Sequence, residues 1–134
     1  MTDVFAGRLM SSPVESVSPS TPVREAAKRM LDNEIGSVVV TDESGDLQGI
    51  LTTTDFVRIT AADHSATDAT VADYMTTDVV TATANDPITD VADTMIEHGF
   101  HHLPICDEAE GVIGMLTTTD LTEYLSHFEP PQLA

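Results

Sequence analysis

The sequence repeats itself at a fixed offset of 65 residues, without a gap, so that residues 10–56 match residues 75–121. The clearest match is the run Leu-Thr-Thr-Thr-Asp, which ends at Asp55 in the first copy and at Asp120 in the second. Such a repeat predicts two copies of one supersecondary unit, so any site that one copy builds is expected twice. Because a half of about 60 residues would be marginally stable alone, we expect the two copies to pack on each other.

The chain is strongly acidic. Its 134 residues include 23 Asp and Glu against 5 Lys and Arg, which gives a formal net charge of −18. Yet 41% of the residues are hydrophobic and they are regularly spaced, which argues against a disordered acidic tail. The many carboxylates repel one another at low salt, and this repulsion is screened at high salt. We therefore interpret the chain as a halophilic protein; an acidic mesophilic protein is the alternative.

The same charge argues against a nucleic-acid partner, which needs cations to neutralise its phosphates, and against an anionic membrane surface. The sequence has no run of 18 apolar residues that would predict a membrane span, and its N-terminus lacks the basic-then-apolar pattern of a signal peptide. The single cysteine, Cys106, excludes an internal disulfide and fits a reducing compartment. We therefore expect a soluble, cytoplasmic protein.

Each copy is predicted to contain the same elements in the order β-α-β-β-α. The strands are expected at residues 14–18, 37–41 and 47–52 in the first copy and at 79–83, 102–106 and 112–117 in the second. The first helix of each copy is expected to be capped by Thr21 or Asp86, with the following proline as its first residue. The second helix is expected to begin near the Thr-Asp pair that ends at Asp55 or Asp120.

These elements divide the chain into four segments. The first copy is expected to cover residues 4–62 and the second copy residues 71–128. Residues 63–70, which are small and polar, are predicted to form a linker, and residues 129–134, with two adjacent prolines, a tail.

The end of the last strand in each copy is the first candidate binding site. A strand that leads into a helix N-terminus collects hydroxyls, free backbone N–H groups and the positive end of a helix dipole, which together suit a phosphate or a sugar. Asp55 or Asp120 could accept hydrogen bonds from two ribose hydroxyls, and the threonine hydroxyls could turn to a phosphate or a base edge. The alternative is that this motif only caps the helix, although a cap needs one hydroxyl and each copy offers three.

Histidines gather at the start of one predicted strand. His101 and His102 enter a buried strand, so we expect them to point to opposite faces, and His98 lies just before them. A metal site is the least favoured interpretation, because the three histidines lack the spacing of a helical zinc site and no cysteine or carboxylate pattern completes one. Donation to a phosphate and plain packing at the strand end both remain open.

Arg58 lies three residues after Asp55, one turn into the predicted helix, in a chain with few basic residues. It could contact a phosphate near Asp55, or it could simply pair with one of the many surface acids. The second copy has Glu123 at the equivalent position, which would repel a phosphate. This difference favours the Asp55 site for an anionic ligand.

Catalysis finds little support in the sequence. No serine lies in a nucleophile elbow, and there is no Walker loop or glycine-rich dinucleotide motif. Cys106 lies within an apolar strand, where a structural role is the usual one. We therefore do not expect an enzyme.

Four features together resemble the cystathionine β-synthase (CBS) domain. They are the methionine before each copy, the Thr-Pro-Val-x-Glu-Ala helix start, the run His-His-Leu-Pro-Ile-Cys-Asp, and the Gly-x-Leu-Thr-x-x-Asp strand end. The chain resembles a stand-alone tandem pair, a Bateman module, over residues 4–128. The first copy has Ser-Val-Val-Val where the family has Leu-Pro-Val and matches it more loosely. The resemblance implies an α+β fold of two units related by a pseudo-twofold axis, commonly assembled as a homodimeric disc.

The resemblance also implies two clefts, each built crosswise from both copies. At the first, Asp55 would hold a ribose and the second copy would supply the wall that faces the base. The residues implied for this site are Thr52, Thr54, Asp55, Arg58, Thr81, Phe100, His101, His102 and Leu103. Those implied for the second site are Ser16, Ile35, Gly36, Val38, Thr117, Thr119 and Asp120. Because the Gly36-Ser37 pair supplies no basic group, strong phosphate binding is less expected at the second site.

The function implied is regulatory. Members of the family bind adenosyl ligands, such as AMP, ADP, ATP or S-adenosylmethionine, and pass the signal to an enzyme, transporter or other partner. No separate cofactor is expected, and the effector must lie in another chain. The alternative is a dimerisation or protein-interaction module with empty clefts, and metal binding through His98, His101 and His102 is a more distant one.

Overall fold

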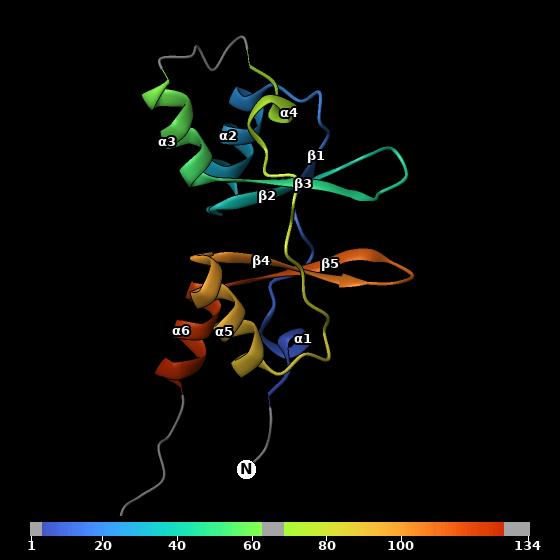
Figure 1. The fold of residues 1–134 in the computed structure, drawn as a ribbon, viewed down its shortest axis with the longest axis vertical. Helices are drawn as coiled ribbons and strands as arrows, with labels where there is room; N and C mark the ends of the chain where they lie inside the picture. Colours follow the sequence, from blue (N-terminus) through green and yellow to red (C-terminus); the bar gives the residue numbers. More distant parts are fainter. Residues whose placement is uncertain (1–3, 63–68, 128–134) are drawn as a thin grey trace, which may run out of the picture.

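Two β-sheets face each other at the centre of the molecule, and helices cover their outer faces (Figure 1). The computed structural model describes residues 4–62 and 69–127. The first sheet contains β1 (Ser16–Val17), β2 (Ser37–Thr41) and β3 (Leu47–Thr52), in that order. Strand β1 is parallel to β2, and β2 is antiparallel to β3, with Val39 opposite Ile50.

The second sheet is smaller. It contains β4 (His102–Asp107) and β5 (Gly111–Thr117), which are antiparallel. The strand expected at residues 79–83 is reduced to an isolated parallel bridge between Ala82 and Ile105, although Ala82 still accepts a hydrogen bond from the amide of Cys106 at 2.8 Å. The chain therefore follows β4 as it follows β2 in the first unit, but over a shorter length.

Among the described residues, four long helices and two short ones accompany the sheets. They are α1 (Ala6–Leu9), α2 (Val23–Asp32), α3 (Thr53–Ala61), α4 (Val71–Tyr74), α5 (Ile88–His98) and α6 (Thr118–Ser126). The helices α3 and α6 begin one residue before the expected Thr-Asp pairs, with Thr52 and Thr117 as their N-caps. In each, the aspartate at the third helical position completes a capping box.

The expected caps of α2 and α5 are wrong. Both helices start one residue later than predicted, so that Pro22 and Pro87 occupy the N-cap positions and no side chain caps either helix. The hydroxyl of Thr21 instead accepts a hydrogen bond from the Ser18 amide at 3.1 Å. Asp86 likewise accepts one from an amide of the preceding loop, at 2.9 Å. These side chains stabilise the turns before the helices rather than the helices themselves.

Each unit is completed by the opening segment of the other repeat. In Figure 1, α1 lies with α5 and α6, whereas α4 lies with α2 and α3. The Ala6 amide donates to the carbonyl of Asp86 at 2.9 Å, and the Val71 amide donates to the carbonyl of Thr21 at 2.8 Å. Ala6 and Val71 are fully buried in the cores of the units that receive them. The chain therefore crosses between the units twice.

The apolar residues form three clusters, one inside each unit and one between the sheets. Strand β2 contributes to two of them, because alternate side chains point to opposite faces of a strand. Val38 and Val40 pack into the core of the first unit, and Val39 packs between the sheets with Ile50 and Met115. Both faces of the first sheet are therefore covered, and β2 is an almost continuous apolar run.

Two segments, residues 10–15 and 75–80, connect the units, and we call them the crossing segments. Glycines lie where these segments pass over the sheets. The amides and carbonyls of Ile50 and Thr76 exchange hydrogen bonds at 3.0 and 2.9 Å. A Cβ on Gly49 would lie 2.7 Å from the carbonyl oxygen of Thr76, whereas one on Gly114 would meet only side-chain atoms of Met10. The first contact is with backbone that is held on both sides, and the second is with a flexible side chain.

We expect Gly49→Ala to lower the free energy of unfolding by about 2–3 kcal/mol, and Gly114→Ala by roughly half as much, because the thioether of Met10 can rotate away. The measurement is urea unfolding in molar KCl. Equal losses in the two variants would contradict the close backbone approach at Gly49.

Candidate functional site

Two clefts open between the units, and each has walls from both repeats. We name them after their buried or half-buried aspartates. The Asp55 cleft has a volume of about 240 Å³ and is lined by Ile50, Thr52, Thr53, Thr54, Asp55, Arg58, Thr76, Asp78, Val79, Val80, His98, Gly99, Phe100, His101, His102 and Pro104. The Asp120 cleft has a volume of about 590 Å³ and is lined by Ser11, Pro13, Val14, Glu15, Asn33, Glu34, Ile35, Gly36, Ser37, His101, His102, Met115, Thr117, Thr118, Thr119, Asp120 and Glu123.

The carboxylate of Asp55 is fixed at the N-terminus of α3. One oxygen accepts hydrogen bonds from the amide of Thr52 at 2.8 Å and from its hydroxyl at 3.4 Å. The other oxygen accepts one from Arg58 at 3.2 Å. The side chain of Asp55 is only 3% exposed, whereas that of Arg58 is 68% exposed. The carboxylate is therefore buried and held by hydrogen bonds at both oxygens, while its cationic partner is exposed to solvent.

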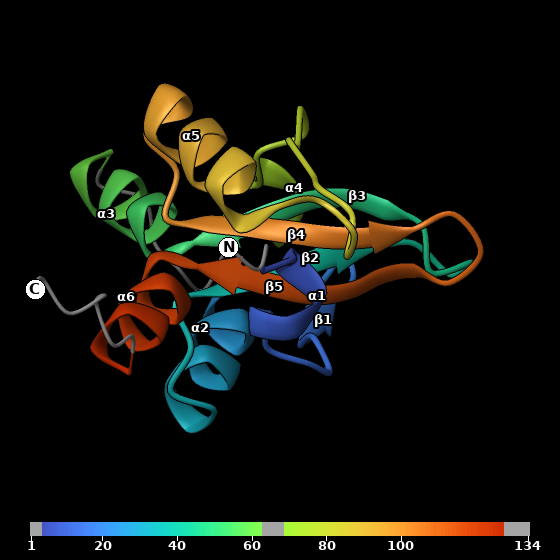
Figure 2. The ribbon, with the colours of Figure 1, turned by 90° about the horizontal axis from the view of Figure 1, so that it is seen from below.

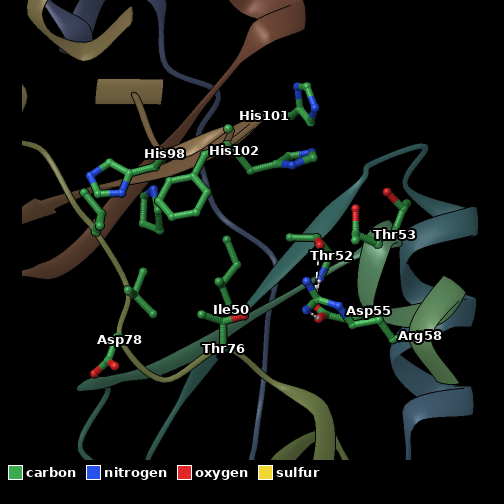
Figure 3. Close-up of a pocket in the computed structure, with 16 residues that line it drawn as sticks. Ile50, Thr52, Thr53, Asp55, Arg58, Thr76, Asp78, His98, His101 and His102 are labelled. Atoms are coloured by element: carbon green, nitrogen blue, oxygen red, sulfur yellow. Dashed lines mark hydrogen bonds and ion pairs between the residues drawn. The ribbon is translucent and has the colours of Figure 1, made fainter. Parts of the chain in front are cut away.

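The opposite wall of the Asp55 cleft comes from the second repeat. Figure 3 shows Thr52, Asp55 and Arg58 on one side of the cleft and the three histidines on the other. The rings of His98 and Phe100 stack with their centroids 5.0 Å apart. Apolar side chains from the crossing segment and from the sheets also line the cleft. This wall offers flat, mainly apolar surface to a planar group.

The Asp120 cleft repeats the helix start but differs in charge. Asp120 accepts hydrogen bonds from the Thr117 amide at 2.9 Å and from the Ser11 hydroxyl at 3.3 Å. Glu123 occupies the position on α6 that Arg58 occupies on α3. The second aspartate is therefore held without an arginine.

His101 and His102 line both clefts. His102 is half-buried, and a Cβ on Gly36 would lie 2.7 Å from its Nε2 atom. Burial lowers the pKa of the His102 imidazole, and His101 lowers it further, whereas Asp120 acts in the opposite direction. His102 therefore reaches across to Gly36 of the first repeat, and its burial there favours the neutral imidazole.

Most of the residues that the sequence suggested line a cleft. In the first they are Thr52, Thr54, Asp55, Arg58, Phe100, His101 and His102, and in the second Ile35, Gly36, Thr117, Thr119 and Asp120. The histidines were expected to point to opposite faces of one strand, but His101 precedes β4 and contributes to the same two clefts as His102.

Four of the suggested residues do not line a cleft. Leu103 and Val38 are fully buried in the unit cores, because they point to the opposite face of the strand from their neighbours His102 and Ser37. Thr81 is instead hydrogen-bonded through its side chain to Cys106, whose thiol pKa is raised by burial. Ser16 lies in β1, where its carbonyl accepts a hydrogen bond from Arg29 at 2.8 Å.

The crossing segments contribute lining residues that were not expected from the sequence. Thr76, Asp78 and Val79 line the Asp55 cleft, and the equivalent residues Ser11, Pro13 and Val14 line the Asp120 cleft. The 65-residue offset relates these two sets and could have revealed them as a pair. Glu34 was also missed; it adopts a left-handed backbone conformation, with φ of 53°, beside the suggested Ile35.

The described histidines do not form a metal centre. Within residues 4–62 and 69–127, no three His, Cys, Asp or Glu side chains are grouped so that they could hold a metal ion. His98 is instead stacked on Phe100. In the same two ranges, no helix combines the length and apolar character needed to cross a membrane.

Both repeats of the chain match one protein family. The model of the CBS domain matches twice, over residues 6–62 and 71–127. The chain belongs to the CBS domain family. A CBS-domain protein of Bacillus subtilis, YhcV, is 31% identical over 84% of this chain and 79% of its own length. An uncharacterized 17.7 kDa protein of Acidianus ambivalens is 36% identical over 88% of this chain and 71% of its own.

Two solved structures share almost the whole fold of this chain. A conserved protein of Pyrococcus horikoshii is 30% identical and covers 98% of each chain, with a TM-score of 0.85. The CBS domain pair of protein MJ0100, solved with 5′-methylthioadenosine and S-adenosylmethionine, is 26% identical over 93% of this chain and 98% of its own, with a TM-score of 0.86. Homoserine O-acetyltransferase of Methanocorpusculum labreanum is 32% identical, but this chain spans only 24% of its length.

We expect His102 to make the CBS pair less stable at acidic pH. Because its pKa is lowered in the folded state, its contribution is complete above the unfolded value near 6.5 and is lost as the pH falls from there towards the folded value. His102→Gln removes this titration. The unfolding free energy of the wild type should therefore fall relative to that of the variant between about pH 7.5 and pH 5, with a slope of at most about 1.4 kcal/mol per pH unit.

Urea unfolding at constant salt measures this difference. The control is His127→Gln, because His127 is exposed at the end of α6 and lines neither cleft. If the curves of the wild type and of His102→Gln run parallel over the whole pH range, His102 is not the group responsible.

Proposed function

We propose that this CBS pair is a regulatory module that binds adenosyl ligands in its clefts and signals to a separate partner protein. The observation that carries the proposal is the Asp55 cleft. A buried, hydrogen-bonded carboxylate lies there at a helix N-terminus, beside an exposed arginine and opposite a wall that contains the stacked rings of His98 and Phe100. The two ligands named for the MJ0100 domain pair are both adenosyl compounds, which supports this ligand class.

Each part of an adenine nucleotide finds a suitable partner in this cleft. Asp55 would accept hydrogen bonds from the ribose hydroxyls, for which one of its oxygens becomes free when Arg58 turns away. Arg58 and the exposed threonine hydroxyls at the start of α3 would then contact phosphate, which a helix N-terminus also favours. The base would lie against Phe100 and the apolar residues of the crossing segment.

A ligand in this position would alter the relation between the units, because its ribose and base would be held by different repeats. It can shift the arrangement only if it binds one arrangement more tightly than another. The histidines shared by the clefts give the second site a direct way to sense the first. We infer that the module itself performs no catalysis and that the response occurs in the partner.

The cellular setting follows from the same features. We propose a cytoplasmic, halophilic protein that acts without nucleic acid or membrane, because its charge of −18 opposes both anionic surfaces. It would bind AMP, ADP or ATP more tightly as salt screens the long-range repulsion, until the screening saturates. The alternative function, a protein-interaction module with empty clefts, predicts no response to any adenosyl ligand.

Thermal unfolding in molar KCl tests the function. A panel of AMP, ADP, ATP, S-adenosylmethionine and NAD should contain at least one compound that raises the Tm by several degrees. At 100 times its dissociation constant, a ligand adds about 2.7 kcal/mol to the stability of the folded state. If no compound of the panel raises the Tm, the proposal is contradicted and the interaction module is favoured.

Variants of the capping aspartates test the site. With AMP, we expect Asp55→Ala to weaken binding by roughly tenfold or more and Asp120→Ala to weaken it less, because only Asp55 is accompanied by an arginine. Asp73→Ala is the matched control: Asp73 completes the same capping box in α4 but lines neither cleft. Calorimetric titration measures the affinities, and full retention of affinity in both cleft variants would refute the assignment.

We also propose a homodimer, as is common in the family. Leu31 on α2 and Ile96 on α5 occupy equivalent positions in the repeats and are 77% and 79% exposed, which leaves large apolar side chains in water in the isolated chain.

The double variant Leu31→Glu, Ile96→Glu should raise the dimer dissociation constant by at least about tenfold per side chain, because burial of each is worth roughly 1.5–3 kcal/mol. Sedimentation equilibrium measures the constant. The control is Ser44→Glu with Ala109→Glu, at equivalent exposed turns of the two hairpins. A wild type that sediments as a monomer, or a double variant that dimerises like the control, would rule out this interface.

A further inference from the structure

The two clefts differ in charge, and at one pair of equivalent positions, Arg58 and Glu123, the charges are opposite. Among the residues that line the Asp120 cleft are four carboxylates, Glu15, Glu34, Asp120 and Glu123, and neither Lys nor Arg. The Asp55 cleft has two carboxylates and one arginine, together with His98, and His101 and His102 line both clefts. The clefts therefore share a fold and a capping motif but not an electrostatic character.

Most of these carboxylates remain available to a ligand. Glu15 lies 3.7 Å from Arg29, and both side chains are more than a third exposed, so this pair is weak. Within residues 4–62 and 69–127, no ion pair engages Glu34 or Glu123. Their charges are therefore left for the contents of the cleft and for solvent.

The position of Glu123 determines that the Asp120 cleft would disfavour a phosphate. Arg58 and Glu123 lie at the same place in the repeat, three residues after the capping aspartate and one helical turn from it. If a nucleotide lay in the Asp120 cleft as it would in the Asp55 cleft, its phosphate would meet a carboxylate instead of a guanidinium. Like charges at such close range repel, even where distant charges are screened.

The remaining lining still suits an adenosyl group. Asp120 repeats the fixed carboxylate for a ribose, and Pro13, Val14, Ile35 and Met115 supply apolar surface. The volume of about 590 Å³, against about 240 Å³ for the Asp55 cleft, leaves room for a substituent larger than a phosphate.

We propose that the two clefts sort adenosyl ligands by the charge of the 5′ substituent, so that the Asp120 cleft takes a cationic sulfonium or ammonium compound and the Asp55 cleft takes a phosphorylated one. This proposal rests on the proposed function, because it assumes that both clefts hold adenosyl groups. Glu123 and Glu34 are the residues that would select the cation, and Arg58 is the residue that would select the phosphate.

A reciprocal charge exchange tests the sorting. The variants are Arg58→Glu and Glu123→Arg, which exchange the two equivalent exposed side chains. Glu108→Arg is the control, because it makes the same change in net charge as Glu123→Arg at an exposed hairpin turn outside both clefts. The probes are AMP, S-adenosylmethionine and 5′-methylthioadenosine, which keeps the adenosyl sulfur but carries no charge.

Calorimetric titration of each variant with each probe should give a clear pattern. Glu123→Arg should lower the affinity for S-adenosylmethionine by about tenfold and change the affinity for methylthioadenosine by no more than about threefold. The same variant should bind AMP more tightly at a second site. Arg58→Glu should lower the affinity for AMP by about tenfold and leave the affinity for S-adenosylmethionine unchanged. In the wild type, saturating AMP should not displace S-adenosylmethionine, because the two occupy different clefts.

Failure of the sorting and failure of the proposed function give different results. If Glu123→Arg changes the affinities for S-adenosylmethionine and methylthioadenosine equally, or no more than Glu108→Arg does, the sorting by charge is overturned although adenosyl binding stands. Competition between AMP and S-adenosylmethionine for one cleft would overturn it as well. If none of the three probes binds to the wild type, the adenosyl function itself is lost, and the sorting with it.

Discussion

The exchange of the opening segments is the constraint on which the rest of the structure depends. Each unit would lack part of its core without Ala6 or Val71, both of which arrive from the other repeat. The chain must therefore pass between the sheets twice, and it does so next to Gly49 and Gly114, of which Gly49 meets backbone and Gly114 meets the side chain of Met10. In Figure 2 the two sheets are stacked with both hairpin turns at the same end. The clefts lie beside the crossing segments, so the contacts that hold the units together also build the candidate sites.

The two repeats have the same residues at the positions that cap the second helix, and different residues at a nearby exposed position. Thr52 with Asp55, and Thr117 with Asp120, satisfy the free amides at the start of a helix, and that requirement is the same in both units. Arg58 and Glu123 are exposed, and neither belongs to a capping box. Their identity can therefore change the ligand without changing the fold, which is how one duplicated unit can present two different sites.

Local features of the sequence predicted local structure well, and non-local packing poorly. The strands 37–41 and 47–52 and the helix start at Asp55 follow from apolar runs and capping chemistry within a few residues, and all are present. Leu103 and Val38 were misplaced because a match to a motif does not say which face of a strand a side chain occupies. The contributions of Thr76 and Ser11 depend on which unit receives each crossing segment, and no spacing within one repeat contains that information.

The net charge of the protein acts on a ligand from a distance, whereas the charges inside a cleft act at contact. This difference explains how so acidic a protein could bind an anion. In molar salt the Debye length is about 3 Å, so the repulsion from most of the −18 charge is screened before a nucleotide arrives. Groups in direct contact with the ligand are not screened in this way. Selection between a phosphate and a cation would then rest on the few charges inside each cleft, foremost Arg58 in one and Glu123 in the other. A net charge of −18 is therefore compatible with one cleft that would accept phosphate and one that would reject it.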